Sequence, residues 1–229
     1  RGWIKAMKGH GDLASDLSKF KEGDGPAFAF HAQTTDRLLL VCDDGRVFTL
    51  GADKLPGARG FGEPVRSMLD IDNEARIVAL LPAQPDANLL LVASNGRGFQ
   101  AQTSEIMAET RKGKQVVNLK PGVRLAVARP IETGADHIAV IGENRKLVVF
   151  SLNELPVMSR GQGVQLQRYR DGGLSDAISF RLEDGLSWTM GGDSGRTRTE
   201  KDMGLWRVAR GAAGRLPPNG FPRSNRFSD

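Results

Sequence analysis

The chain of 229 residues carries 32 Lys and Arg against 27 Asp and Glu, a net charge of +5, and one cysteine, Cys42. Its length suits one all-β domain or two smaller units, and a single cysteine excludes an internal disulfide framework. No apolar run approaches the roughly 20 residues that span a bilayer, and no secretory signal is visible.

The first repeat, over residues 1–35, begins as if within a hairpin, because Arg1–Lys5 resembles the second half of a turn unit that recurs downstream. This suggests that the chain belongs to a longer polypeptide. Alternating large and small residues over 26–31 predict a half-buried strand. His31 has no second ligand candidate close to it in the sequence, so a packed or surface histidine is favoured over a metal ligand.

The second repeat, over residues 36–86, contains the apolar run Leu38–Cys42, an Asp-Asp-Gly turn and a second strand that starts at Arg46. A continuous apolar run of this kind is typical of a strand covered on both faces. The loop 59–64 contains two glycines but no third glycine and no Gly-Lys-Ser/Thr ending, which argues against a nucleotide site. A closing strand is predicted over 76–81.

The third repeat, over residues 87–135, is the most regular copy. Leu89–Ala93 leads into an Asn-Gly pair, which predicts a two-residue hairpin turn with positive φ at both positions. The segment 104–110 has helical propensity. A basic loop follows at Arg111–Lys114, and a closing strand is predicted over 123–128.

The fourth repeat, over residues 136–184, contains the run His137–Ile141 and the only tyrosine, Tyr169, between two arginines. A tyrosine next to arginine can be the nucleophile of covalent DNA cleavage. That chemistry needs a metal-binding carboxylate cluster and a positioned arginine in one pocket, so an edge tyrosine between surface arginines is favoured.

The fifth repeat, over residues 185–229, is the least regular. Trp188 and Trp206 are predicted to be packing residues. The proline-rich basic tail from Leu216 is expected to run extended along a surface or to be mobile. Two roles stay open for it: joining the last repeat to the first, or forming a simple terminus.

The repeats predict one all-β domain over residues 1–229. Turn positions 2, 45, 96, 145 and 195 are separated by 43, 51, 49 and 50 residues. A period near fifty residues with about four short strands is the size of a propeller-like blade, so we expect five blades.

Cations return at the hairpin turns and in the glycine-bearing loops of each repeat. Equivalent positions of successive repeats fall on one rim of a blade array, and a ring of positive charge suits a curved polyanion. The predicted DNA-binding residues are Lys5, Lys8, Arg46, Arg59, Arg97, Arg111, Lys112, Lys114, Arg145, Lys146, Arg160, Arg168, Arg196 and Arg198.

These repeats resemble the C-terminal domain of bacterial type IIA topoisomerase A subunits, the β-pinwheel, over the whole chain. The segments 20–24, 31–37, 60–66 and 166–173 are similar to the topoisomerase IV branch in particular. Gyrase A subunits carry a Gln-Arg-Arg-Gly-Gly-Arg-Gly heptapeptide in the first blade. The equivalent loop here, Lys19–Gly25, reads Lys-Phe-Lys-Glu-Gly-Asp-Gly and lacks that arginine cluster.

The resemblance implies a five-bladed β-pinwheel, closed or open, in which neighbouring blades exchange strands. It implies a non-catalytic domain that binds and bends double-stranded DNA with little sequence preference, and no cofactor or metal within these residues. ATP and Mg²⁺ would act in other domains of the holoenzyme. The implied protein partners are the cleavage domains of the same polypeptide and the B subunit of topoisomerase IV, in a heterotetramer. The isolated domain would be monomeric, and the location cytoplasmic and nucleoid-associated, with the holoenzyme peripheral to the inner membrane.

Two other classes of protein stay open. One is the DNA-wrapping domain of the gyrase A polypeptide, and the other is a propeller-like protein-interaction module. An interaction module would expose aromatic and hydrophobic residues, yet aromatics are only 6% of this chain. An enzyme with its own active site is the least favoured class.

Overall fold

The apolar runs form the central strands of three equivalent antiparallel sheets. The computed structural model describes residues 2–13, 20–57, 59–190 and 195–228. The second unit contains β2 (Arg37–Cys42), β3 (Arg46–Gly51) and β5 (Ile77–Pro82). The third contains β6 (Asn88–Ala93), β7 (Arg97–Gln102) and β9 (Leu125–Pro130). The fourth contains β10 (His137–Gly142), β11 (Leu147–Ser151) and β13 (Leu174–Phe180). In each, the first strand of the hairpin lies between the other two.

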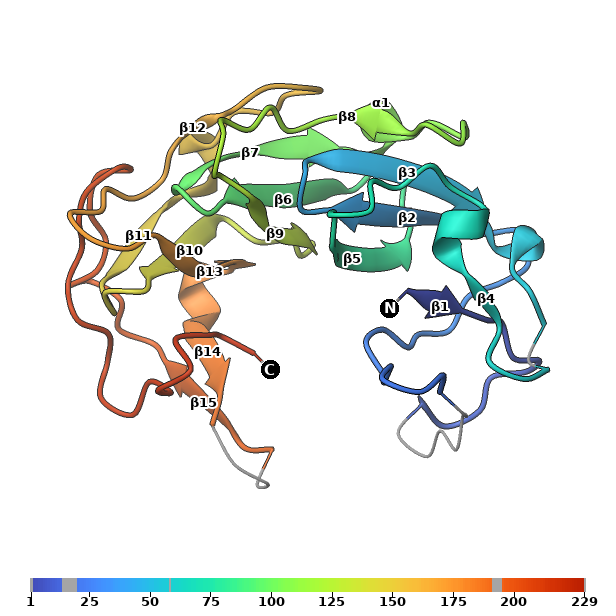
Figure 1. Cartoon of the computed structure of the whole chain (residues 1–229). Helices are drawn as coiled ribbons and strands as arrows, with labels where there is room; N and C mark the ends of the chain where they lie inside the picture. The colour runs from blue at the N-terminus through green and yellow to red at the C-terminus, as the bar shows by residue number, and fades with distance from the viewer. Residues whose placement is uncertain (1, 14–19, 58, 191–194, 229) are drawn as a thin grey trace.

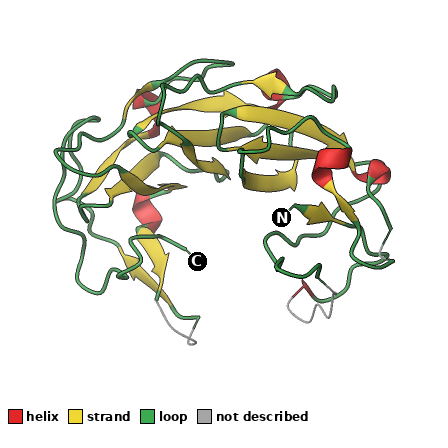
Figure 2. Ribbon diagram, in the orientation of Figure 1, coloured by secondary structure: helices red, strands yellow, loops and turns green. Residues whose placement is uncertain are grey.

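Two smaller sheets flank these three. The first unit pairs β1 (Trp3–Ile4) with β4 (Glu63–Pro64), and the fifth pairs β14 (Leu186–Thr189) with β15 (Thr197–Glu200). Helical structure within the described residues consists of α1 (Thr103–Ile106), where a helix was expected, of the 3₁₀ turns η2 (Ala52–Lys54), η3 (Val65–Ser67), η4 (Leu152–Glu154) and η5 (Leu182–Asp184), and of Leu13, which is also in 3₁₀ conformation. Figure 2 shows this predominance of strands and loops.

Neighbouring units exchange strands, as the resemblance implied. Strand β8 (Lys114–Gln115) follows β7 in the chain but pairs with β3 of the second unit. Strand β12 (Val164–Gln165) pairs in the same way with β7 of the third unit. The fourth unit receives Arg207 and Arg215 through isolated bridges to β11. A unit in space is therefore not identical with a repeat of the chain.

The exchanged strands lie on the outside of an open arc (Figure 1). Strands β5, β9 and β13 lie on its inner side, and the sheets β1–β4 and β14–β15 lie at its two ends. Among the described strands, none pairs the first unit with the fifth. The fold is thus an all-β, propeller-like array with an open form.

Each central strand is buried on both faces, as its continuous apolar run predicted. Leu39 and Val41 of β2 face the third unit and belong to one buried cluster with Leu89 and Leu91. The alternate residue Leu40 faces the first unit, in another cluster. The core is therefore a series of apolar layers between adjacent sheets rather than one central mass.

The prediction of a two-residue Asn-Gly turn is wrong. In the three central hairpins the turn has three residues, and only the last has positive φ: Gly45 at 84°, Gly96 at 83° and Arg145 at 62°. The side-chain oxygen of the second turn residue accepts a hydrogen bond from the backbone amide two residues later. In the third unit, for example, the Arg97 amide donates to Asn95 Oδ1. That side-chain bond stabilises an ordinary turn followed by one left-handed residue.

Two further expectations are corrected. Residues 26–31 form no strand and are largely exposed, because their alternating pattern has no neighbouring sheet to pack against. The C-terminal tail (216–228) is packed, not free. Phe221 and Phe227 are buried against Trp188 between the fourth and fifth units. Within the described residues the tail bonds to the third, fourth and fifth units, so it packs against its neighbours instead of joining the last repeat to the first.

Candidate nucleic-acid interface

The outer edge consists of the exchanged strands and the loops that precede them (Figure 1). One glycine with positive φ stands directly before each exchanged segment: Gly62, Gly113, Gly163 and Gly214. A Cβ at Gly113 would lie 2.6 Å from the Val47 carbonyl oxygen, and the other three glycines also face a carbonyl of the preceding unit. These glycines permit close backbone approach between units. The close approach between units therefore explains Gly62 in the loop 59–64 without a nucleotide site.

Exposed cations of the outer edge lie in these same loops. Arg59, Arg111, Lys112 and Arg160 are exposed. Arg111 donates to the Ser67 carbonyl (3.2 Å) and pairs with Asp70 (3.3 Å). The Lys114 ammonium donates to the Glu105 carbonyl at 2.7 Å. These partners hold the Arg111 and Lys114 side chains at the edge, while Arg59 and Lys112 are exposed to solvent.

The arginines at the hairpin turns donate hydrogen bonds to backbone carbonyls of other segments. Arg46 donates to the Lys112 carbonyl (2.6 Å) and Arg97 to the Gly163 carbonyl (3.0 Å), each across to the loop of the next repeat. Arg145 donates to the carbonyls of Phe221 (3.2 Å) and Pro222 (2.9 Å). All three are part-buried. The prediction of a DNA contact at these arginines did not anticipate that their guanidinium groups hold units and tail together.

The remaining predicted residues fall at three places. Lys5 donates to the Gly60 carbonyl at 3.4 Å, and Lys8 is exposed in the same unit. Lys146 and Arg168 are exposed on the fourth unit and on the loop after β12, respectively. Arg196 and Arg198 are exposed at and beside β15. The structure thus places Arg59, Arg111, Lys112 and Arg160 in equivalent loops before the exchanged strands, and leaves Arg196 and Arg198 on the end unit.

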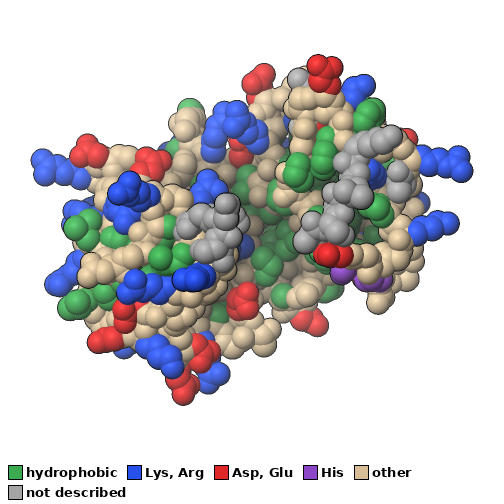
Figure 3. Space-filling model, turned by 90° about the horizontal axis from the view of Figure 1, so that it is seen from below, with side chains coloured by type: hydrophobic (Ala, Val, Ile, Leu, Met, Phe, Trp, Pro, Cys, Tyr) green, Lys and Arg blue, Asp and Glu red, His purple; other side chains and the backbone are tan. Residues whose placement is uncertain are grey.

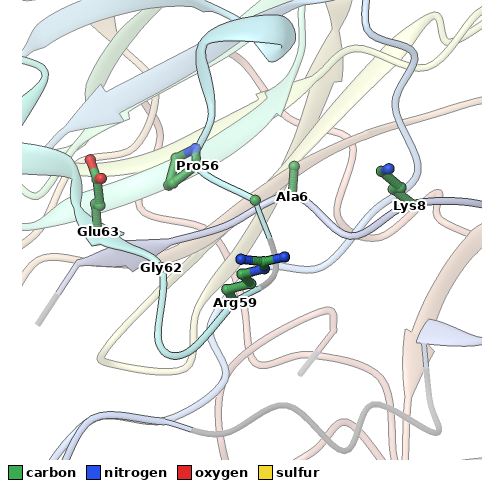
Figure 4. A pocket seen from close by; sticks show the side chains of 7 residues that line it. Ala6, Lys8, Pro56, Arg59, Gly62 and Glu63 are labelled. Carbon is green, nitrogen blue, oxygen red and sulfur yellow. The ribbon is translucent and has the colours of Figure 1, made fainter.

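A shallow crevice of about 670 Å³ marks the outer edge of the first unit. Figure 4 shows Lys8 and Arg59 to one side of Pro56 and Glu63 to the other. Two cations at an open crevice can hold a phosphate group, whereas an enclosed small-molecule site would need more complete burial.

The predicted DNA-binding residues did not include the cations of the basic tail. Arg223 and Arg226 are exposed, and in the sequence they stand between Phe221 and Phe227, whose rings are buried. The spacing of these phenylalanines around arginines was the available signal, but a proline-rich terminus gave no reason to expect burial. Seen from below, the half of the molecule with the last units and the tail carries more Lys and Arg side chains, interspersed with Asp and Glu (Figure 3).

The residue types that could act as nucleophiles or metal ligands lie in environments typical of structural residues. Burial raises the pKa of the Cys42 thiol to about 12, with Asp44 and Asp43 adding to the effect. Burial, followed by the charge of Glu143, also raises the pKa of the Tyr169 phenol. His10 and His31 lie side by side with ring centroids 4.9 Å apart, a proximity that the sequence did not reveal. In the described ranges, His, Cys, Asp and Glu form no group of three that could hold a metal ion.

None of the helices described is long and apolar enough to cross a membrane.

Comparison with known proteins reveals relatives over nearly the full chain. It is 42% identical over 227 residues to the A subunit of DNA topoisomerase 4 from Rickettsia bellii (strain RML369-C), covering 99% of this chain and 30% of that protein. It is 45% identical over 227 residues to the A subunit of DNA topoisomerase 4 from Caulobacter vibrioides, covering 99% of this chain and 29% of that protein. The chain therefore spans about a third or less of the length of these relatives.

Solved structures share the fold. The C-terminal domain of Escherichia coli ParC superposes with a TM-score of 0.82 at 24% identity, covering 97% of this chain and 92% of that one. A DNA gyrase A C-terminal domain gives a TM-score of 0.62 at 17% identity, covering 94% of this chain and 69% of that one.

The profile of the family described as "DNA gyrase C-terminal domain, beta-propeller" matches residues 36–84, 87–132 and 136–176, which are more than half of the chain. These segments coincide with the second, third and fourth units. The chain belongs to this family of β-propeller-like C-terminal domains of type IIA topoisomerase A subunits.

Proposed function

We propose that this chain is the non-catalytic DNA-binding and DNA-bending part of a topoisomerase IV A subunit. It holds duplex DNA along its outer edge and presents a segment for strand passage, in decatenation, relaxation of supercoils and chromosome segregation. The observation that carries the proposal is that Arg59, Lys112 and Arg160 are exposed in equivalent loops of successive repeats, and that the exchanged strands which these loops precede follow the outer edge of the open arc.

The geometry favours phosphate contacts over base readout. The described residues contain one short α-helix, α1, so no recognition helix is available for a major groove within them. If about six phosphates are neutralised, log K falls with log salt with a slope near −5. Bending 20–30 base pairs by 40–90° costs on the order of 1–6 kcal/mol, which phosphate contacts along one arc can offset.

Assignment to topoisomerase IV rather than gyrase rests on the first repeat. The loop 19–25 carries an acidic pair and no arginine cluster, so it supports bending without complete chiral wrapping. The two relatives that are 42% and 45% identical to this chain are both named as A subunits of DNA topoisomerase 4.

The proposed partners are duplex DNA, the remainder of the same polypeptide and the B subunit of topoisomerase IV. ATP and Mg²⁺ belong to those other parts, and the duplex would bring the protein to the nucleoid. Phosphate contacts made by Lys and Arg side chains need no cofactor bound to this chain.

The experiment that tests the proposal is duplex binding with a salt titration and a bending assay, on the wild type and on Arg59→Glu/Lys112→Glu. We expect the double variant to bind at least about tenfold more weakly at low salt and to bend DNA less, because two phosphate contacts become repulsive. Arg181→Glu is a control that reverses a single charge: Arg181 is exposed, pairs with Glu183 and precedes η5 rather than an exchanged strand.

Unchanged affinity and bend angle in Arg59→Glu/Lys112→Glu would remove the outer edge from DNA binding. An equal loss in Arg181→Glu would mean that the duplex responds to net charge and not to this edge.

A further inference from the structure

At the outer edge, the loop of one repeat meets the loop of the next in the same way three times. The Asp70 amide donates to the Arg111 carbonyl, the Asn118 amide to the Gly161 carbonyl, and the Arg168 amide to the Ala212 carbonyl. Each junction lies about fifty residues after the previous one. The three junctions can therefore be compared position by position.

In the first two junctions, an arginine from one loop donates to a side-chain oxygen of the other loop. The Arg111 Nε donates to Asp70 Oδ1 at 3.3 Å, and the Arg160 Nε donates to Asn118 Oδ1 at 3.3 Å. The acceptor is thus an aspartate in one junction and an asparagine in the other.

In the third junction this acceptor is replaced by a cation. The loop arginine here is Arg210, two residues before Ala212, and Arg168 stands where Asn118 and Asp70 supplied the oxygen. Arg210 Nη1 donates to the Gln165 carbonyl at 2.9 Å, but its buried Nε has no hydrogen-bond partner within the described residues. The hydroxyl of Tyr169 is also buried there without a partner in that part of the chain.

These side chains surround a crevice of about 520 Å³, here called the outer crevice, which is lined by Asn95, Gln165, Arg168, Tyr169, Gly172, Arg210 and Gly211. The Tyr169 ring lies between Gly96 and Gly142, where a Cβ would come within 2.6 Å and 2.9 Å of it. The phenol is therefore fixed at the junction of the third and fourth units. Burial, followed by the charge of the nearby Glu143, raises the pKa of the phenol, so it stays protonated and able to donate.

Two guanidinium groups and a phenol with unused donors form a donor set for an oxyanion. We propose that the outer crevice binds one phosphate group, whose oxygens replace the side-chain acceptor that Asp70 and Asn118 supply elsewhere. This inference rests on the proposed function, because a duplex backbone following the outer edge is the main source of such a phosphate. A free phosphate has the same chemistry and is separated from it by the test.

The test compares the wild type with Arg168→Asn, which recreates the Asn118–Arg160 pairing in the third junction. Arg170→Asn removes the same charge two residues away, on an exposed side chain outside the crevice lining, and is the matched control. Duplex affinity is measured over a salt series, and thermal unfolding is measured with inorganic phosphate against chloride at equal ionic strength.

We expect Arg168→Asn to weaken duplex binding by about three- to tenfold at low salt and to reduce the salt slope by about 1, with a smaller effect of Arg170→Asn. Inorganic phosphate should raise the unfolding temperature of the wild type and of Arg170→Asn more than that of Arg168→Asn. The converse variant Asn118→Arg should strengthen duplex binding, because it creates a second uncompensated arginine pair.

Equal losses of duplex affinity in Arg168→Asn and Arg170→Asn, with no stabilisation by phosphate, would refute the phosphate site in the outer crevice. The proposal that the outer edge binds DNA would still stand. Failure of the wild type to bind duplex would refute the proposed function instead. In that case the phosphate series alone decides: selective stabilisation of the wild type supports a site for a free phosphate, and its absence refutes the site.

Discussion

At Arg145 the fold places a long side chain where the two equivalent hairpins carry glycine. A non-glycine residue at φ 62° costs about 1 kcal/mol, and the three hydrogen bonds to Pro222, Phe221 and Asn225 offset that cost. The sequence showed a cation at this turn but not its partner, which lies about eighty residues away in the tail. Individual arginines of similar local sequence therefore differ in role according to what the fold brings near them.

The glycines before the exchanged strands offer a test at the residue scale. Gly163→Ala should destabilise the chain by about 3 kcal/mol or more, because its positive φ of 74° and the adjacent Gly98 carbonyl both oppose a Cβ. Gly122→Ala also has positive φ, 80°, but no atom within 4 Å of the added Cβ, so about 1 kcal/mol is expected. Chemical denaturation measures both. Equal costs would show that the close contact between units contributes nothing.

Asp176 predicts a pH dependence of stability. Burial raises the pKa of this carboxyl above its ordinary value, although it accepts the Phe227 amide and faces Arg129. The folded chain therefore binds more protons than the unfolded chain. The contribution of this carboxyl to stability is fully present below pH about 4 and is lost as the pH rises through the folded pKa.

Asp176→Asn should accordingly lose less stability than the wild type between pH about 4 and 7, measured as the free energy of unfolding at each pH. Asp171→Asn controls for the loss of one charge in the same repeat. A difference between wild type and Asp176→Asn that stays constant across this range would contradict the raised pKa.

At the scale of elements, the tail stabilises the end of the array. Trp188 of β14 contacts Phe221 with ring centroids 5.4 Å apart, and Phe221 contacts Phe227 at 5.5 Å. The Thr189 amide donates to the Phe227 carbonyl at 2.9 Å. Since the fifth unit has two described strands where the central units have three, these contacts supply apolar cover that a further strand would otherwise give.

Phe227→Ala tests this role of the tail. The ring is 1% exposed, so its loss should cost about 3–5 kcal/mol and raise hydrogen exchange in β14 and β15. Phe28→Ala is the control, because that ring is 44% exposed and its removal should change stability by less than about 0.5 kcal/mol. Unaltered exchange in β14 and β15 would show that the fifth unit is stable without the tail.

The sequence predicted the central elements well because their information is local. Each apolar run over Leu38–Cys42, Leu89–Ala93 and His137–Ile141 became a central strand, and the closing strands of the second and third repeats appeared within two residues of their expected starts. The two-residue strands β8 and β12 carry too few residues for a periodic pattern, so their pairing with a preceding unit followed only from the resemblance. The tail was misjudged because its partners are distant in the sequence.

At the scale of the whole molecule, the period of about fifty residues predicted where the cations would recur but not which of them face solvent. Arg46 and Arg97 occupy equivalent positions and both hold the next loop, whereas Lys112 and Arg160 are exposed. The position of a residue within the repeat thus predicts where it lies on the array. Whether its side chain is free to contact duplex DNA depends on the hydrogen bonds that it makes within the fold.

The donated outer strands have a consequence for the protein during its synthesis. Strand β3 ends at Gly51, but its partner β8 begins only at Lys114. At translation rates of about 5–20 residues per second, the ribosome needs roughly 3 to 13 seconds to synthesise the intervening residues, and during this time the outer edge of β3 is unpaired. The third unit waits in the same way for β12, and a nascent chain that stalls in either interval presents a sheet edge open to intermolecular pairing.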